Sequence, residues 1–592
     1  MIADNFLCMP PTLGYPCTMR TLLVTLHSKY IHASLALPCL AAYCGPECGE
    51  LLIREFTVHE PRETILAALL QEEPAVVGLS VYLWNRRESF ELIDALAAAR
   101  PELRLVVGGP EVSFDGAELF SRHPGLTALV RGEGEAPLRA LLTAWAAGSE
   151  PGQVARLTWR RGTALVEGAD GPPLAELDTI PSPFQAGLVA LDRGLVYYET
   201  SRGCPFRCAF CLSAREERVR TFSPERVRTD LAELMARRVA QVKLVDRTFN
   251  SDPVRARDIF AFILAHNQST RFHFEIAAHL LDDETLALLD QAPAGLFQFE
   301  IGVQSTLEAT LHRIERPVAL ERLERAVRRL QQAGRLRLHL DLVAGLPGEG
   351  YADFCTSLDR VAALAPDHLQ VELVKLLPGT PLRDRAGALG LRFDPHPPYT
   401  VLATAELDFA GLERIRRVSR LLDLTWNAGC FPTFLAALAT TAGSLARGLE
   451  VLADDLAEHA WLRYPLSRSG LFVQLGEAVA RQWPAAAARR LRDTLAFDLA
   501  SCERIVPEQT PSLFDTALAD DERGWVAADV RLATDAVRGK GVKLQHFAAS
   551  FAHLPGTSGR TVYLFLYRTR SGAGMTVEAR PLTQPALTPR PA

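Results

Sequence analysis

Short apolar runs alternate with amphipathic helical patterns along most of the chain, and this alternation restricts the possible folds more than any other feature. Five apolar runs lie between residues 19 and 148, and six more recur between 191 and 405, each followed by a helical pattern. Strand–helix alternation of this kind is typical of parallel sheets with helices packed on their faces. The sequence therefore predicts an α/β protein.

The two series favour two different parallel sheets. The first predicts a doubly wound, Rossmann-like sheet from the runs TLLVTL, ELLIREFTV, AVVGLSVYL, LRLVVGG and LTALVRG. The second predicts a partial, TIM-like (βα)6 barrel from the runs VYYETS, QVKLVD, RFHFEIAAH, LFQFEIGVQ, LHLDLVAGL and HLQVELVKLL. Ligands of both folds bind at the carboxyl ends of the strands, so we expect functional residues in the loops that follow them.

The remaining segments set the predicted domain boundaries. No periodicity precedes Met19, where a buried strand begins, so residues 1–18 are expected to be a non-native or disordered extension. A hairpin pattern and a Pro-rich stretch predict a linker over 149–190. The patterns after residue 405 predict a mainly helical domain over 406–583, with one strand-like run, TVYLFLYRT, and a disordered tail over 584–592.

Composition narrows the class of protein. A chain of 592 residues exceeds one hydrophobic core, and the net charge of −6 argues against a nucleic-acid partner. We find no run of 18 apolar residues and no signal-peptide pattern at the N-terminus, so we expect no membrane span and a cytoplasmic location. The odd number of cysteines, 11, fits a reducing compartment better than a disulfide framework.

Cys204, Cys208 and Cys211 form a C-x3-C-x2-C pattern in the loop after the first predicted barrel strand. Three thiolates at this spacing can ligate three irons of a 4Fe–4S cluster and leave the fourth iron open. Structural zinc would require a fourth ligand, and His266 and His273 lie far downstream. The pattern therefore indicates an iron–sulfur site.

This cysteine motif resembles the signature of the radical S-adenosylmethionine (radical SAM) superfamily, in which the open iron binds S-adenosylmethionine. The resemblance implies that Phe210 packs near the adenine and that Asp246 and Asn250 lie near the methionine amino group. Contacts to the ribose or carboxylate are implied for Glu300, Gln304 and Ser305, and adenine contacts for Gly345, Leu346 and Pro347.

Two Gly-rich loops follow strands of the first sheet. Taken alone they are weak signals, because glycine after a strand is commonly just a turn. Together with the downstream cysteine motif they resemble a cobalamin-binding domain, and the residues concerned are Gly108, Gly109, Pro110, Glu111, Gly132, Glu133, Gly134 and Glu135.

The cobalt ligand in such a domain is a separate question. The Asp-x-His-x-x-Gly pattern that ligates cobalt in other cobalamin proteins is absent, and His32 lies near the corresponding loop in a different context. The resemblance thus implies cobalamin without a protein histidine ligand, with Trp84 as the candidate that covers the cobalt. The alternative for Trp84 is packing at a strand end.

The segments KYIHASLAL and VDRTFN, with the region after residue 405, resemble cobalamin-dependent radical SAM proteins that carry an uncharacterised C-terminal domain. That resemblance implies an enzyme that methylates an unactivated carbon of a small molecule or peptide through a 5'-deoxyadenosyl radical. It also implies an electron donor such as flavodoxin or ferredoxin. The alternatives are a cobalamin-assisted rearrangement or cyclisation, a polar methyl transfer, and a non-catalytic protein that binds or senses the cluster and cobalamin.

Overall fold

The computed structural model describes residues 19–215, 218–316, 319–506, 508, 510–557, 559–570 and 574–582. The predicted extension, 1–18, and the predicted tail, 584–592, lie outside these ranges. The chain divides into two compact units. The first runs to Gly302 and includes Glu308–Leu338 and Val374–Ala405; the second comprises Val303–Leu307, His339–Leu373 and the chain from Glu406 onward.

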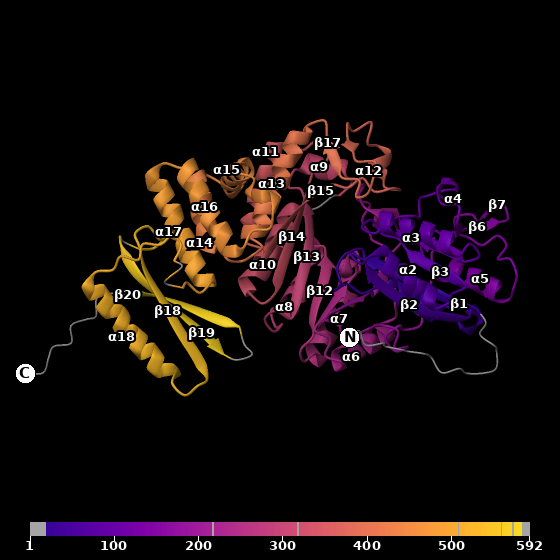
Figure 1. The fold of residues 1–592 in the computed structure, drawn as a ribbon, viewed down its shortest axis with the longest axis horizontal. Coiled ribbons are helices and arrows are strands. Elements are labelled where there is room, and N and C mark those ends of the chain that lie inside the picture. The colour runs from indigo at the N-terminus through magenta and orange to yellow at the C-terminus, as the bar shows by residue number, and fades with distance from the viewer. Residues whose placement is uncertain are drawn as a thin grey trace, which may run out of the picture. The chain divides into compact units, whose positions relative to one another are not determined.

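The first unit begins with the predicted doubly wound sheet (Figure 1). Its parallel strands are β1 (Arg20–His27), β2 (Glu50–Thr57), β3 (Val76–Ser80), β4 (Arg104–Gly108) and β5 (Leu126–Val130). Their order, β2-β1-β3-β4-β5, is one of the two common doubly wound arrangements. The hairpin of the predicted linker, β6 (Leu157–Arg161) and β7 (Ala164–Glu167), extends this sheet by antiparallel pairing with β5.

Helices cover both faces of this sheet. One core contains side chains of α2 (Arg62–Gln71), α3 (Arg86–Ala99) and α4 (Glu118–Arg122), and the other contains side chains of α1 (Ala36–Tyr43) and α5 (Glu135–Ala146). All five residues of β3 are buried, as expected for a strand covered on both faces. Burial of this kind explains why β1, β3 and β4 have continuous apolar sequences rather than alternating ones.

The second sheet has the strand order β15-β14-β13-β12-β11-β8 predicted for a partial (βα)6 barrel. Its strands are β8 (Leu195–Tyr198), β11 (Gln241–Leu244), β12 (Arg271–Ile276), β13 (Phe297–Gln304), β14 (Arg337–Ala344) and β15 (His368–Leu373). The intervening helices are α6 (Pro224–Ala236), α7 (Pro253–His266), α8 (Asp283–Leu289), α9 (Glu308–Arg313), α10 (Leu320–Ala333) and α11 (Tyr351–Ala362). The pairings β8–β11, β11–β12, β12–β13 and β14–β15 are parallel, so the fold class predicted from the sequence is confirmed.

The barrel strands of the first unit separate apolar from polar side chains. Phe272, Phe274, Phe297 and Phe299 are fully buried; the last three pack around Phe260 of α7, and Phe272 packs on Phe274 and Phe297. Burial of each such side chain contributes roughly 2–3 kcal/mol. The alternate positions are polar and only half-buried, so the opposite face of these strands is available for ligands.

The first unit also contains five shorter elements. The strand β9 (Ser201–Arg202) pairs with β10 (Arg220–Thr221), and α12 (Pro381–Asp384) precedes the pair β16 (Arg392–Phe393) and β17 (Val401–Ala403). The pair β9–β10 directly flanks the cysteine loop. It therefore fixes the two ends of the segment that carries Cys204, Cys208 and Cys211.

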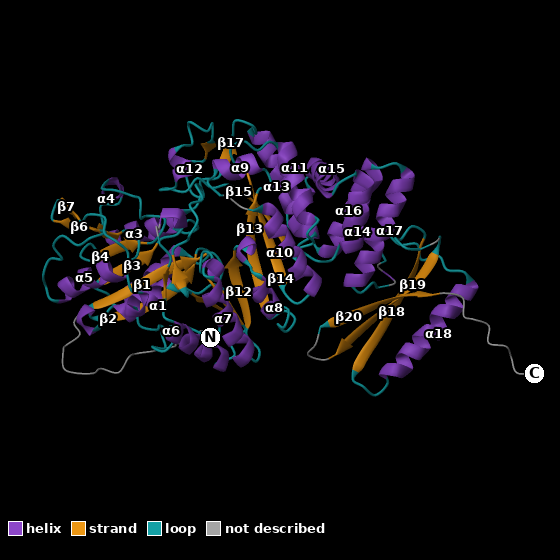
Figure 2. Ribbon diagram, turned by 180° about the vertical axis from the view of Figure 1, so that it is seen from behind, coloured by secondary structure: helices purple, strands orange, loops and turns teal. Residues whose placement is uncertain are grey.

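The C-terminal part of the second unit is mainly helical, as predicted (Figure 2). Its helices are α13 (Phe409–Thr425), α14 (Pro432–Ala442), α15 (Leu445–Glu458), α16 (Arg468–Gln482), α17 (Ala485–Cys502) and α18 (Asp520–Val537). An antiparallel sheet of β18 (Val542–Phe551), β19 (Thr561–Arg570) and β20 (Met575–Leu582) packs on α18. None of the helices described is both long and apolar enough to cross a membrane.

Candidate functional site

A cavity of about 1390 Å³ opens at the carboxyl ends of β1, β3, β4 and β5, entirely within the first unit. Small-molecule pockets usually measure about 300–1,000 Å³, so this one accommodates a ligand of unusual size. Its lining includes eight predicted cobalamin residues: Trp84, Gly108, Gly109, Pro110, Gly132, Glu133, Gly134 and Glu135. Residues after β8 and β11, among them Glu199, Arg202 and Arg247, form another part of the wall.

Glu111 does not line this cavity. Its side chain is buried and accepts a hydrogen bond from the Tyr399 hydroxyl, and Arg86 lies 3.5 Å from its carboxylate. Burial raises the pKa of Glu111 above its ordinary value, and its two partners oppose that shift. The structure therefore gives Glu111 a role in fixing the loop after β4.

The loop glycines are required by the protein's own packing. Gly109 has a φ of 110°, and a Cβ there would lie 2.5 Å from the Val81 carbonyl oxygen. Gly132 has a φ of 67°, and its Cβ would lie 2.7 Å from Arg156 Nη1. Only glycine adopts such conformations readily, so close packing of the loops already accounts for both residues.

Trp84 lies on the cavity wall with 48% of its surface exposed. Its indole stacks on Tyr82, with ring centroids 4.5 Å apart, and its Nε1 donates to the Leu26 carbonyl at 3.1 Å. His32 also lines the cavity, and its Nδ1 is 2.7 Å from the Tyr197 hydroxyl. Trp84 thus presents a held, accessible ring, whereas one ring nitrogen of His32 is already engaged.

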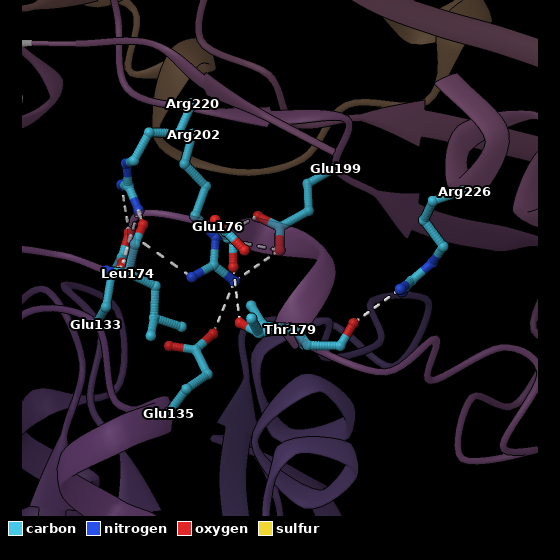
Figure 3. A network of polar contacts seen from close by, with 10 residues as sticks. Glu133, Glu135, Leu174, Glu176, Thr179, Glu199, Arg202, Arg220 and Arg226 are labelled. Carbon is cyan, nitrogen blue, oxygen red and sulfur yellow. Dashed lines mark hydrogen bonds and ion pairs between the residues drawn. The ribbon is translucent and has the colours of Figure 1, made fainter. Parts of the chain in front are cut away.

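Glu133 and Glu135 form ion pairs with arginines of the β9–β10 pair (Figure 3). Arg202, two residues before Cys204, lies 2.7 Å from both Glu135 and Glu199, and Arg220 binds Glu133. Burial raises the pKa of Glu133, but Arg220 and Arg202 outweigh burial and hold that pKa below its ordinary value. We call Glu133, Glu135, Glu199, Arg202 and Arg220 the arginine bridge.

The cysteine loop is held by hydrogen bonds from several segments of the first unit. Cys204 Sγ is 3.4 Å from Thr248 Oγ1, and Arg316 Nη1 donates to Cys208 Sγ at 3.3 Å. Burial raises the pKa of the Cys208 thiol, Arg316 opposes that shift, and the nearby Cys211 and Cys204 add to it. The three thiols therefore lie within electrostatic reach of one another, next to hydrogen-bond donors suited to cluster sulfurs.

Asp246 and Asn250 lie beside this loop but already have protein partners. Asp246 is completely buried and accepts from the backbone N–H and the hydroxyl of Thr200 and from the Ser201 hydroxyl. The Asn250 amide bonds both backbone groups of Ala277, at 2.9 and 3.0 Å. A direct contact from either side chain to S-adenosylmethionine stays a prediction, while their structural roles are visible.

Glu300 has the partners that a buried carboxylate needs. Its Oε2 is 3.1 Å from Lys243 Nζ and 2.8 Å from His273 Nε2. Burial raises its pKa, but these two partners outweigh burial and lower the pKa to about 2. Phe210, the remaining predicted residue of the first unit, is half-buried in the cysteine loop.

The other predicted residues lie in the second unit. Ser305 is fully buried and donates to Glu349 at 2.6 Å, while Gln304 has a φ of 69° at the end of β13. Gly345, Leu346 and Pro347 are buried directly after β14. Glu349 closes this segment, and burial raises its pKa to about 7.

Glu349 makes the stability of the second unit depend on pH. Because its pKa is about 7 in the folded chain and 4.5 ordinarily, the folded chain binds this proton more tightly. The contribution of Glu349 to the free energy of unfolding is therefore complete below about pH 4.5. It is lost as the pH rises through 7, which lowers the free energy of unfolding by at most about 3 kcal/mol. We expect Glu349→Gln to remove this decline in thermal unfolding midpoints. The exposed Glu458→Gln should retain it, and an unchanged slope in Glu349→Gln would contradict the assignment.

Several residues of the site carry no local sequence signal. Arg316 lies 108 residues from Cys208, and the Lys243 and His273 partners of Glu300 lie on neighbouring strands. Arg202 is the exception, because it directly adjoins the cysteine motif. Among the described residues, no three His, Cys, Asp or Glu side chains gather as ligands of one metal ion; in a 4Fe–4S cluster, each cysteine binds a different iron.

Comparison with known families matches three consecutive parts of the chain. Residues 21–142 match the B12 binding domain, residues 198–361 the radical SAM superfamily, and residues 388–523 a protein family of unknown function, DUF4080. The radical SAM match implies a 4Fe–4S cluster and S-adenosylmethionine, and the B12 match implies cobalamin. The family resemblance and the cofactors predicted from the sequence are confirmed.

Two curated relatives are similar to part of this chain. The cobalamin-dependent radical SAM methyltransferase TokK of Streptomyces tokunonensis is 28% identical over 60% of this chain and 55% of its own length. The 2-(S-pantetheinyl)-carbapenam-3-carboxylate methyltransferase of Streptantibioticus cattleyicolor is 27% identical over 55% of this chain and 50% of its own length. The chain thus spans about half the length of these relatives.

Two solved structures share the fold. TsrM from Kitasatospora setae, a radical S-adenosylmethionine methyltransferase solved with cobalamin and a 4Fe–4S cluster, has a TM-score of 0.53 and 20% identity over 64% of this chain and 78% of its own. OxsB with aqua-cobalamin has a TM-score of 0.59 and 16% identity over 88% of this chain and 84% of its own. By its family matches, the chain joins a B12 binding domain to a radical SAM domain and a DUF4080 segment.

Proposed function

We propose that this protein is a cobalamin-dependent radical SAM methyltransferase that methylates an unactivated carbon of a small molecule or peptide. The observation that carries the proposal is the shared cavity: the B12-domain loops and the segments that flank the cysteine motif line the same space. Both cofactors would then act on one substrate. The names of the two curated relatives support methyl transfer.

The residues present fit the implied groups. Cys204, Cys208 and Cys211 would ligate the cluster, and the cavity with its exposed Trp84 ring would hold cobalamin. When bound, these cofactors supply one-electron cleavage of S-adenosylmethionine and a transferable methyl group. The protein's part is to fix their positions: Asp246 anchors Thr200 and Ser201, and Arg202 anchors Glu135.

The proposed enzyme needs a low-potential electron donor such as flavodoxin or ferredoxin, and we infer a cytoplasmic location. Clusters span about −700 to +450 mV, and this chemistry uses the low end. The nine described cysteines are free, which supports a reducing compartment.

The proposal is tested by product analysis under anaerobic conditions. Protein loaded with cluster and hydroxocobalamin is given S-adenosylmethionine, a strong reductant and candidate substrates, with the Cys204→Ala, Cys208→Ala, Cys211→Ala variant as control. Formation of both 5'-deoxyadenosine and S-adenosylhomocysteine by the wild type alone supports radical methyl transfer. Formation of 5'-deoxyadenosine alone would favour rearrangement, S-adenosylhomocysteine alone polar transfer, and neither product a binding or sensing role.

Arg316 should set the reduction potential of the cluster. A positively charged donor to a ligating sulfur stabilises the more negative, reduced cluster and so raises its potential. We expect Arg316→Gln to lower the midpoint potential in a redox titration followed by electron paramagnetic resonance, with unchanged iron content. Arg385→Gln, which removes a half-exposed pair with Glu315, is the matched control. Equal potentials in both variants would show that the hydrogen bond to Cys208 has no such effect.

A further inference from the structure

The large cavity is more positive than the protein around it. Seven arginines and four carboxylates line it, although the whole chain has a net charge of −6. An excess of positive charge in a cavity attracts anions, because the surrounding protein focuses the field into it. The ligands of this cavity are therefore expected to carry negative charge.

The four carboxylates already have arginine partners. Three of them, Glu133, Glu135 and Glu199, belong to the arginine bridge, and the fourth, Asp170, lies 3.4 Å from Arg131. The excess charge therefore lies on other arginines of the wall. An anion site requires an arginine of this wall whose guanidinium has no carboxylate partner.

Arg247 is the clearest of these. Its guanidinium is exposed in the cavity wall and makes no hydrogen bond or ion pair with any residue in the described part of the chain. The backbone of Arg247 is nevertheless held on both sides. The preceding Asp246 is buried and accepts a hydrogen bond from the Thr200 hydroxyl, and the hydroxyl of the following Thr248 contacts Cys204. A fixed backbone thus presents a free guanidinium beside the cysteine loop.

Arg215 is a second cation on the same wall, four residues after Cys211. Its Nη1 donates to the Gly379 carbonyl at 2.6 Å, and its guanidinium lies 5.1 Å from the centre of the Phe114 ring. These contacts hold the side chain in place, and no carboxylate of the described residues pairs with its charge. Both arginines therefore come from segments adjoining the cluster cysteines.

We propose that Arg247, assisted by Arg215, binds an anionic oxygen group, a phosphate or a carboxylate, inside this cavity. The inference rests on the proposed function, because it takes the cavity to hold cobalamin. Guanidinium forks match such groups with two parallel hydrogen bonds. Two ligands can supply the group: the phosphodiester of cobalamin itself, or an anionic methyl acceptor.

Binding measurements on the full chain separate these sources. The ligands are hydroxocobalamin and cobinamide, which lacks the phosphodiester, and the proteins are wild type, Arg247→Gln, Arg247→Lys and the exposed Arg271→Gln control. If the phosphodiester is the ligand, Arg247→Gln loses about tenfold or more in affinity for hydroxocobalamin but none for cobinamide. Arg247→Lys should recover part of the loss because it keeps the charge.

A second titration uses inorganic phosphate on cobalamin-loaded protein, followed by calorimetry. Phosphate binding to the wild type that is lost in Arg247→Gln, with cobalamin affinities unchanged, identifies a separate anion subsite for the methyl acceptor. Equal behaviour of Arg247→Gln and wild type in both titrations overturns the inference, as does equal weakening of both corrinoids. A wild type that binds neither corrinoid would instead overturn the cobalamin assignment on which the inference rests.

Discussion

Replacing Cys204, Cys208 and Cys211 together with alanine removes the iron–sulfur cluster and leaves cobalamin binding intact. Each thiolate ligates a different iron, so the triple variant has no protein ligands for the cube at this site. None of the three side chains lines the large cavity, so the corrinoid contacts remain. We expect iron and acid-labile sulfide to fall to background and the brown chromophore to disappear. The cobalamin dissociation constant should stay within about twofold. A change of that size is well below the 1.4 kcal/mol of binding free energy that corresponds to a tenfold change.

The matched control is Cys355→Ala, which removes a half-buried thiol of the second unit and should keep the full cluster. A full complement of iron in the triple variant would contradict the assignment of the motif. Loss of cobalamin binding together with the cluster would show that the cysteine loop must be ordered before the cavity forms. The two results differ in iron content, so one preparation separates them.

Most of the fold could be predicted because local patterns determine it. The runs that become β1, β3 and β4 are continuous and apolar, which is what strands covered on both faces require. The pairing of the β6–β7 hairpin with β5 could not be predicted, because register between strands depends on long-range contacts. In the C-terminal sheet only β19 had a clear strand pattern; β18 and β20 are less buried.

The candidate site was predictable only where chemistry depends on spacing along the chain. Cys204, Cys208 and Cys211 form such a motif, and the Gly-rich loops follow strands in the expected places. The partners of the predicted acidic residues are long-range instead. Asp246 binds Thr200 from 46 residues away, and Glu135 binds Arg202 from 67 residues away. A sequence shows that a buried carboxylate needs a partner, but it does not show which one.

Arg202→Gln should strongly destabilise the first unit. Arg202 is largely buried and lies between Glu199 and Glu135, and burial raises the pKa of Glu199 above its ordinary value (Figure 3). Glutamine cannot neutralise these carboxylates, and removing one member of a buried ion pair costs about 3–5 kcal/mol. We expect a lower thermal midpoint in the apo protein. Arg237→Gln, which breaks a surface pair with Glu233, should change it little.

The arginine bridge also predicts that both cofactor sites depend on the ion pair between Arg202 and Glu135. Glu135 opens α5 of the B12 binding domain, and Arg202 lies two residues before Cys204, so each holds the other's loop. Arg202→Gln should therefore weaken cobalamin binding and lower cluster occupancy, and Glu135→Gln should do the same. The double variant should lose less than the sum of the two single losses, because both remove one interaction. Strictly additive losses would show that Arg202 and Glu135 act independently on the two sites. An Arg202→Gln protein as stable as Arg237→Gln would show that the arginine bridge does not stabilise the first unit.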